Sequence, residues 1–125
     1  MSVASNKQLV LDFYETAFNR KDIDAVAAFI GPEYVQHNPA IGDGLPGLLE
    51  RLGQLADASP ELTVRVTRLI AEGDHVTAHV HAVRAPGQRG VAIMDIFRVA
   101  AGKLVEHWDV MQDVPEHSKN PNGMF

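Results

Sequence analysis

The first half of the chain has the hydrophobic periodicity of helices. Apolar residues recur every three to four positions within residues 5–19, which predicts an amphipathic helix with Ser5 as its N-cap. A second, shorter helix is predicted to start after Asp22 and to end before Pro32, because a proline is poorly tolerated inside a helix. Leucines at helical spacing over residues 45–56 predict a third amphipathic helix.

The second half of the chain has the two-residue alternation of half-buried strands. Long strands are predicted over residues 62–71 and 75–85, followed by a hairpin over residues 91–112. A short strand over residues 34–38 lies between the second and third helices and ends at a proline. Three helices followed by an antiparallel meander predict an α+β fold, and the polar tail over residues 115–125 is expected to be a loop.

Composition and charge narrow the class of protein. The length of 125 residues suits one domain, which is expected to span residues 1–125. The net charge of −5 and the lack of a Lys/Arg block argue against a nucleic-acid-binding protein. No apolar run approaches ~20 residues and no signal peptide is recognised, so we expect a cytoplasmic protein with no membrane partner. The chain has no cysteine, which excludes disulfides, thiolate metal ligands and cysteine nucleophiles.

The C-terminal hairpin carries two carboxylates and a histidine in an otherwise apolar sheet. Because a positive φ is costly for Ala101, we expect a type I turn with Gly102 in the left-handed conformation. This turn would place Asp95 opposite His107, with Asp109 on the same face of the sheet and within reach of both. Acidic groups that point into an apolar interior are costly unless they are paired or used, so these three residues form the first candidate site.

Several segments of the chain together resemble SnoaL-like proteins of the nuclear transport factor 2-like superfamily. The segments are the N-terminal helix pair, Tyr-Val-Gln-His-Asn-Pro (34–39), Asp-Ile-Phe-Arg-Val (95–99), Gly-Lys-Leu-Val-Glu-His-Trp-Asp (102–109) and Asn-Gly-Met-Phe (122–125). The resemblance implies a cone-shaped α+β barrel, in which three N-terminal helices pack on a strongly curved, mainly antiparallel sheet that encloses a pocket. Similar chains are known as predicted SnoaL-like aldol-condensation enzymes, which are related to polyketide cyclases.

The resemblance also implies site residues. SnoaL-type cyclases close a ring by intramolecular aldol condensation without metal or cofactor, and an aspartate late in their chain serves as the acid/base. The matching position here is Asp109 in His-Trp-Asp. An asparagine contributes to the pocket of some members, which makes Asn38 a candidate if its strand faces inward. A histidine position of the cyclases is occupied here by Asp95, a departure that bears on the polyketide substrate but not on a general acid/base function.

The same residues fit acid/base chemistry on general grounds. Aldol condensation needs a base that removes a proton next to a carbonyl group, and a donor that stabilises the enolate oxygen. An apolar pocket favours the protonated form of a carboxyl group, so Asp109 beside Trp108 could act as a base near neutral pH. His107, held by Asp95, could be the donor or could orient the acid. The alternatives are a plain cross-strand ion pair between Asp95 and His107, and a solvent-exposed Asp109.

Further candidates for the lining of the pocket come from other elements. His37 and Asn38 lie on opposite faces of the short strand, so only one can point inward, and we favour His37 at the mouth. His79 is expected to line the pocket as a neutral hydrogen-bonding group. Tyr14, on the apolar stripe of the first helix, is either a core residue or a donor to the substrate. Trp108 completes the substrate-binding candidates.

The histidines also require a metal site to be considered. His79 and His81 lie on one face of a strand and, with His37 or His107, could surround a metal ion. Such a site requires three or four converging ligands. Because the family resemblance offers no metal precedent, we expect neither a metal nor a cofactor.

These observations favour a cofactor-independent acid/base enzyme (a lyase, isomerase or cyclase) that acts on a small, largely apolar or aromatic carbonyl compound. The alternatives are a ligand-binding module without chemistry and an epoxide hydrolase-like enzyme, which needs an Asp-Arg-Asp set. Arg98 is predicted on the face opposite Asp95, which counts against the hydrolase. The apolar outer face of the sheet, with Met94, Ile96 and Val110, predicts a homodimer.

Overall fold

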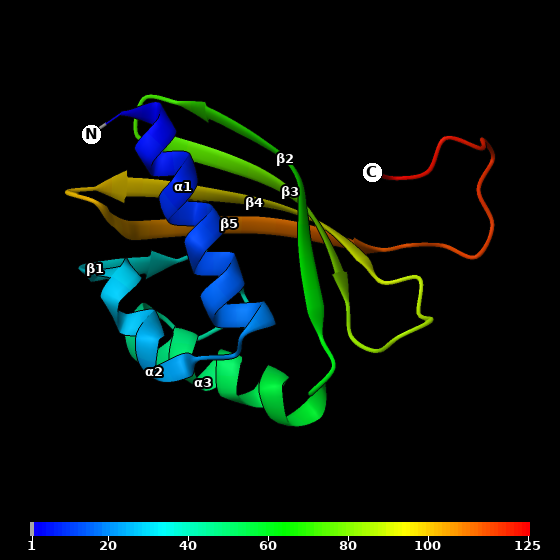
Figure 1. The fold of residues 1–125 in the computed structure, drawn as a ribbon, viewed down its shortest axis with the longest axis horizontal. Coiled ribbons are helices and arrows are strands. Elements are labelled where there is room, and N and C mark those ends of the chain that lie inside the picture. The colour runs from blue at the N-terminus through cyan, green and yellow to red at the C-terminus, as the bar shows by residue number, and fades with distance from the viewer. Residues whose placement is uncertain (1) are drawn as a thin grey trace.

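The computed structural model describes residues 2–125, and its helices pack on one face of a single five-stranded sheet (Figure 1). The helices are α1 (Val3–Tyr14), which continues as a π-helical segment (Glu15–Asn19), α2 (Ile23–Val26), which continues as a 3₁₀ turn (Ala27–Phe29), and α3 (Gly44–Ala58). The strands are β1 (Ile30–Gln36), β2 (Thr63–Glu72), β3 (His75–Val83), β4 (Val91–Ala100) and β5 (Lys103–Asp113). Within residues 2–125, no helix is long and apolar enough to cross a membrane.

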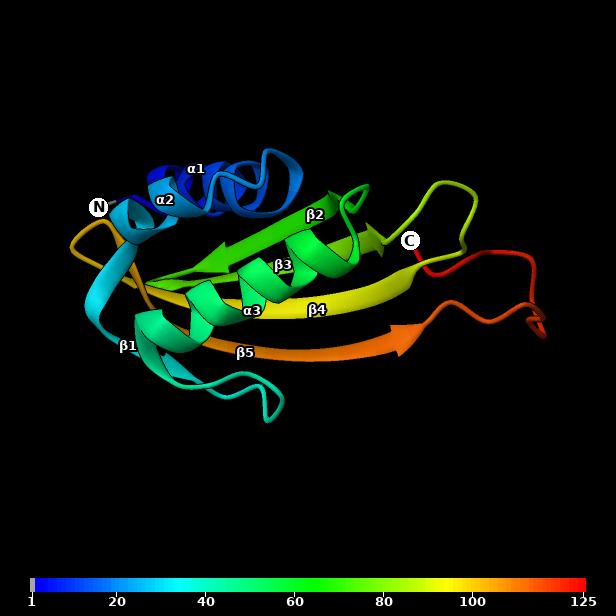
Figure 2. The ribbon, with the colours of Figure 1, turned by 90° about the horizontal axis from the view of Figure 1, so that it is seen from below.

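The sheet is curved and mainly antiparallel (Figure 2). Its strand order is β1-β5-β4-β3-β2, in which β1 pairs in parallel with β5 and all other neighbours are antiparallel. Strands β1 and β2 form the two edges, so the sheet is open, and the helices cover its concave face (Figure 2). The expected α+β architecture, with three helices on a curved antiparallel sheet, is confirmed.

The first helix begins earlier than its sequence pattern predicts. Its N-cap is Ser2 rather than Ser5, because the two serines form a capping box in which each backbone N–H donates to the other's Oγ at 3.0 Å. The helical segment ends at Asn19, where it was expected to end. The Asn19 side chain then bonds the backbone C=O of Val64 at 2.9 Å and its N–H at 2.7 Å. This amide therefore fastens the helix to the edge strand β2.

The β4–β5 hairpin turns through two residues. Ala101 and Gly102 have φ angles of 49° and 72°, as in a type I′ turn, so the expected type I turn is wrong. The twist of a type I′ turn matches that of the two strands, which offsets the local cost at Ala101. Asp95 consequently pairs with Asp109 rather than with His107, and a bulge lies between the turn and this pair. Because the register differs from the expected one by two residues, the same side chains still face inward.

An aromatic cluster joins the first helix to the sheet. Phe13 of α1 contacts Phe97 of β4 edge to face, with ring centroids 5.8 Å apart, and it meets three further aromatic rings of the helical layer in the same way. Such pairs contribute about 0.5–1.5 kcal/mol each beyond the area they bury. Phe97 is buried and also contacts the ring of His107, with centroids 4.9 Å apart. The apolar core therefore ends directly at the polar residues of the hairpin.

Candidate functional site

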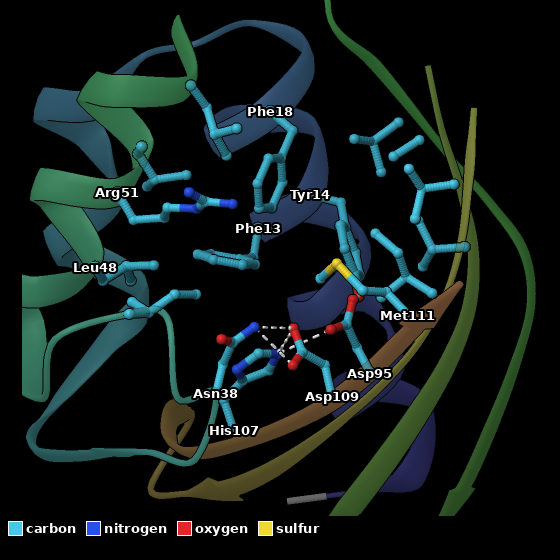
Figure 3. Close-up of a pocket in the computed structure, with 18 of the residues that line it drawn as sticks. Phe13, Tyr14, Phe18, Asn38, Leu48, Arg51, Asp95, His107, Asp109 and Met111 are labelled. Atoms are coloured by element: carbon cyan, nitrogen blue, oxygen red, sulfur yellow. Dashed lines mark hydrogen bonds and ion pairs between the residues drawn. The ribbon is translucent and has the colours of Figure 1, made fainter. Parts of the chain in front are cut away.

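A cavity of about 110 Å³ lies between the concave face of the sheet and the helices (Figure 3). Most of its walls are apolar. Its polar lining residues are Tyr14, Tyr34, Gln36, Asn38, Asp95, His107 and Asp109, together with Arg51 and Arg84. The enclosed space is somewhat smaller than the ~150 Å³ of a cavity that holds benzene, but this cavity is partly open, so a compact ring compound can extend beyond the enclosed part.

The structure brings Asp95, His107 and Asp109 together on the inner face of the hairpin (Figure 3). Nε2 of His107 lies 2.8 Å from Oδ1 of Asp95 and 3.8 Å from Oδ2 of Asp109. Tyr14 of α1 donates its hydroxyl proton to Oδ2 of Asp95, so both oxygens of this carboxylate are engaged. All three hairpin side chains are less than a tenth exposed, and they still line the cavity.

Gln36 of β1 determines which nitrogen of His107 carries a fixed proton. Oε1 of Gln36 accepts from the backbone N–H of Asn38 at 3.0 Å, which sets the orientation of the amide. The same oxygen lies 2.7 Å from Nδ1 of His107, so Nδ1 carries a proton and donates it to Gln36. A second proton lies between Nε2 of His107 and Oδ1 of Asp95, on either the imidazole or the carboxyl group. The pair can therefore give or take a proton without rearrangement.

Asn38 holds the second carboxylate in place. Its Nδ2 donates to the two oxygens of Asp109 at 2.8 and 3.0 Å. Its Oδ1 accepts from the backbone N–H of Ala40 at 2.8 Å, so the amide cannot turn over without losing that bond. A neutral donor orients the carboxylate without cancelling its charge. Asp109 is therefore a buried, oriented carboxylate that faces free space in the cavity.

The end of strand β1 and the residues that follow it bring both amides to the hairpin. Gln36 lies next to His107 in the parallel β1–β5 register, and the backbone N–H of His37 donates to the carbonyl of His107 at 3.0 Å. The Asp43 side chain, just before α3, accepts from the backbone N–H of Gln36 at 2.8 Å. The end of the strand is thus held from both sides, and Gln36 and Asn38, two positions apart, both point to the cavity.

Two buried tyrosines, Tyr14 and Tyr34, line the cavity, and both lie close enough to Asp95 to be affected by its charge. Burial, and then the negative charge of Asp95, raise the pKa of Tyr14 well above its ordinary value. The same two causes raise the pKa of Tyr34. Both phenols therefore stay protonated at neutral pH and can act only as donors to a negatively charged group.

His37 points away from the cavity, so the expectation that it lies at the mouth is wrong. Its Nε2 lies 2.7 Å from Oε2 of Glu106 on the outer face, and Nε of Arg98 donates to Oε1 of the same carboxylate at 2.9 Å. Donation from His37, and then from Arg98, lowers the pKa of Glu106. The physical reason is the ring of Tyr34, which is buried on the inward face and so sends His37 outward by alternation.

His79 and Trp108 also lie on the outer face, so neither lines the cavity, contrary to expectation. Trp108 stacks on His37 with ring centroids 4.9 Å apart. His79 is hydrogen-bonded to Arg68 and stacks on Phe125 of the C-terminal tail, with centroids 5.5 Å apart. The apolar residues of β3 occupy its inward positions, which leaves the histidines of this strand facing outward.

One group of side chains within residues 2–125 has donor atoms close enough together to hold a metal ion. These atoms belong to Asp95, His107 and Asp109 and lie within 4.8 Å of one another. A proton already joins Asp95 to His107, so a cation would have to displace it. His79 and His81, the ligands considered from sequence, instead lie against Phe125 on the outer face. Metal binding releases the protons of its ligands, so this group can hold either the proton or a cation in its place.

Arg51 is a cavity residue that sequence reasoning missed. It lies on α3 between Leu48 and Leu55, and Figure 3 shows its guanidinium group directed from the helix into the cavity. The spacings of three and four residues to these leucines place Arg51 on the apolar face of the helix, which was the available signal. Arg84, just after β3, also lines the cavity.

Solved structures share this fold. The chain is similar to TsrD from Streptomyces laurentii, with 27% identity and a TM-score of 0.74 over 89% of this chain and 90% of that chain. It is also similar to IdmH from Streptomyces antibioticus, a proposed polyketide cyclase, with 23% identity and a TM-score of 0.73 over 85% and 91% of the two chains. A proposed ketosteroid isomerase from Kribbella flavida has 19% identity and a TM-score of 0.73 over 97% and 85%.

The family of this chain follows from comparison with models of protein families. A search of curated proteins finds no match to this chain. The SnoaL-like domain, by contrast, matches residues 10–107, which include the end of α1, the amides of Gln36 and Asn38, and the hairpin as far as His107. Because this match spans most of the chain and the fold is that of NTF2-like proteins, the chain belongs to the SnoaL-like family.

Proposed function

We propose that this protein is a cofactor-independent acid/base enzyme that acts on a small, largely apolar carbonyl compound, with Asp109 as the general base. One observation carries the proposal: the Asp109 carboxylate is 8% exposed, is oriented by Asn38 and lines a mostly apolar cavity. The similar structures named as a polyketide cyclase and a ketosteroid isomerase support this choice, because both reactions pass through an enolate.

The proposed reaction begins with proton transfer from carbon. Asp109 removes a proton from the carbon next to the carbonyl group, and the electron pair of that C–H bond becomes the enolate. In an isomerisation, the enolate takes the proton back at another carbon. In an aldol reaction, it attacks a second carbonyl group, a C–C bond forms, and the resulting alkoxide takes the proton from Asp109. A base placed in this way contributes about 10²–10⁴-fold to the rate.

Donors for the enolate oxygen are available beside the base. Tyr34 lines the cavity and keeps its proton, because burial raises its pKa. The Asp95–His107 pair holds a further proton within the same polar cluster. Tyr14 acts through Asp95 as a positioning residue. Donors that are fixed before the reaction stabilise developing charge more than mobile water does.

Hydrogen–deuterium exchange tests the role of Asp109 directly. The wild-type protein should accelerate exchange of the methyl protons of acetophenone in D₂O, followed by NMR. Asp109→Asn keeps the shape of the side chain and can still accept from Asn38, so the fold should persist while the acceleration falls by about 10²–10⁴-fold. Asp113→Asn, exposed at the end of β5, is the matched control and should keep the wild-type rate. Full activity in Asp109→Asn would remove Asp109 from the mechanism.

A ligand-binding module without chemistry is the second candidate, which the apolar walls of the cavity favour. In that case, wild-type protein would bind aromatic ketones and would not accelerate proton exchange. The position of Asp109 favours the enzyme, because a carboxylate with a purely structural role would be sealed from the cavity rather than line it.

We also propose that the protein forms a homodimer through the outer face of the sheet. Met94, Ile96 and Val110 are exposed there, next to Trp108, and contact with a second copy would remove this apolar area from water. Light scattering should give the mass of a dimer for the wild type and of a monomer for Val110→Lys. A monomeric wild type would contradict the proposal.

A further inference from the structure

Arg51 is a charged group in the cavity whose charge the protein does not balance. Its guanidinium group points into the cavity, apart from the Asp95–His107–Asp109 cluster (Figure 3). The two carboxylates of the cavity are engaged elsewhere, Asp95 by His107 and Tyr14, and Asp109 by Asn38. Within residues 2–125, Arg51 makes no ion pair and no hydrogen bond.

An arginine in this position has a physical cost that calls for a ligand. The Arg51 side chain is only partly exposed and lies among apolar walls, so its guanidinium group loses part of its hydration, and pairing with an anion would recover that part. Arg84 lines the same cavity and also an adjoining groove, whose lining includes Arg89 and Asp113. The cavity thus has two arginines in its lining in addition to the carboxylates.

We propose that Arg51 binds a carboxylate group of the substrate, so that the substrate is a carbonyl compound with a carboxylate distant from the carbon that loses its proton. The position of the reacting carbon, at Asp109, rests on the proposed function. The binding of a carboxylate by Arg51 does not depend on it. Arg84, which also lines the cavity, supplies a second positive charge there.

A carboxylate fits this site better than a phosphate. The planar guanidinium group offers two parallel N–H donors that match the two oxygens of a carboxylate. A phosphate monoester carries nearly two negative charges at neutral pH, and it would meet the carboxylates of Asp95 and Asp109 in the same cavity. The net charge of −5 of the whole chain adds to this repulsion.

Three matched ligands test the proposal by calorimetric or NMR titration. The first, 4-acetylbenzoate, has an enolisable methyl ketone at one end and a carboxylate at the other. The second, 4-acetylbenzamide, has nearly the same shape without the charge, and the third, 4-acetylphenyl phosphate, carries the larger charge. The benzoate should bind about 10- to 100-fold more tightly than the amide, as expected for a charge-assisted pair. It should also bind more tightly than the phosphate.

Variants of Arg51 assign the preference to this residue. Arg51→Met keeps most of the apolar reach and removes the charge, so the ratio between benzoate and amide affinities should fall to about one with the amide affinity unchanged. Arg51→Lys should keep part of the preference. Arg65→Met, exposed on β2 and not part of the cavity, is the control and should keep the full ratio. Equal binding of benzoate and amide by the wild type, an unchanged ratio in Arg51→Met, or tighter binding of the phosphate would overturn the proposal.

Asp109→Asn separates this proposal from the proposed function. It removes one negative charge from the cavity, so 4-acetylbenzoate should bind at least as tightly while proton exchange is lost. Undiminished exchange in this variant, together with an Arg51-dependent preference, would contradict the role of Asp109 and leave the carboxylate site intact. If Asp109→Asn loses acetophenone exchange but the wild type shows no preference for the benzoate over the amide, the role of Asp109 is supported and the carboxylate site at Arg51 is contradicted.

Discussion

Two histidine–carboxylate pairs lie on opposite faces of the same sheet, with nearly equal distances and different surroundings. His107 and Asp95 on the inner face are 2.8 Å apart, with side chains 9% and 8% exposed. His37 and Glu106 on the outer face are 2.7 Å apart, with side chains 41% and 18% exposed. Water can replace either partner of the outer pair, whereas the inner pair depends on protein groups alone. Burial and additional partners, rather than distance, therefore distinguish a candidate catalytic pair from a surface pair.

The additional partners of the two pairs also differ: those of the inner pair are neutral, and one of those of the outer pair is charged. The inner pair is completed by two neutral groups, the hydroxyl of Tyr14 and the amide of Gln36, which orient the carboxylate and the imidazole ring. The outer pair is completed by a cation, Arg98, and by a stacking contact between His37 and Trp108. The inner arrangement stays poised to transfer a proton, whereas the outer arrangement neutralises charge. Three substitutions test this contrast.

The largest effect should come from Asp95→Ala. Removal of one partner of a buried pair leaves His107 and the hydroxyl of Tyr14 without an acceptor, which typically costs about 3–5 kcal/mol of unfolding free energy. Urea denaturation followed by circular dichroism measures this cost. A loss below about 1 kcal/mol would show that the inner pair is no more important than an exposed one.

An intermediate effect is expected for Tyr14→Phe, with a distinct pH dependence. Loss of the hydrogen bond to Asp95 should cost about 1.5–3 kcal/mol near neutral pH. Because the pKa of Tyr14 in the folded state lies above its unfolded value of ~10, its contribution is complete below that pH and is lost as the pH rises further. The wild type should therefore lose stability more steeply than Tyr14→Phe between pH ~9 and ~11. Parallel slopes in urea denaturation across this range would count against the assignment.

The smallest effect should come from Glu106→Gln on the outer face. The pKa of Glu106 is lowered in the folded state, so its contribution is present above the unfolded value of ~4.3 and is lost as the pH falls through the folded value. Stability at neutral pH should change little, and the decline below pH ~4.3 should become slightly less steep. Denaturation curves at acidic and neutral pH check this. A loss as large as that of Asp95→Ala would remove the difference between the two faces.

The sequence is sufficient to place the hairpin side chains on one face but not to set their register. Alternation has a period of two, so the two-residue error in register left Asp95, His107 and Asp109 together. The turn was mispredicted because the cost of a positive φ at Ala101 is local, whereas the strand twist that offsets it belongs to the whole hairpin. The backbone preference of a single alanine therefore gave the wrong turn type, because the twist of the two paired strands outweighs it.

The outward histidines show a different limit. On β1, only the burial of Tyr34 reveals which face is inward, and that depends on the helices packed above it, so His37 could not be placed from its own strand. On β3, the alternation of Val76, Ala78 and Val80 with histidines already indicated outward histidines. The expectation for His79 gave more weight to chemical type than to this pattern.

The parallel pairing of β1 with β5 has a consequence for the order of folding. The hydrogen bonds that orient the inner cluster join residues 71 positions apart at Asn38–Asp109 and 81 positions apart at Tyr14–Asp95. Closure of such long loops costs entropy that a hairpin alone does not recover. Strands β4 and β5 can pair early, but the groups that orient their carboxylates arrive only when α1 and β1 dock. The reactive arrangement is thus a property of the finished fold, and a partly folded chain does not possess it.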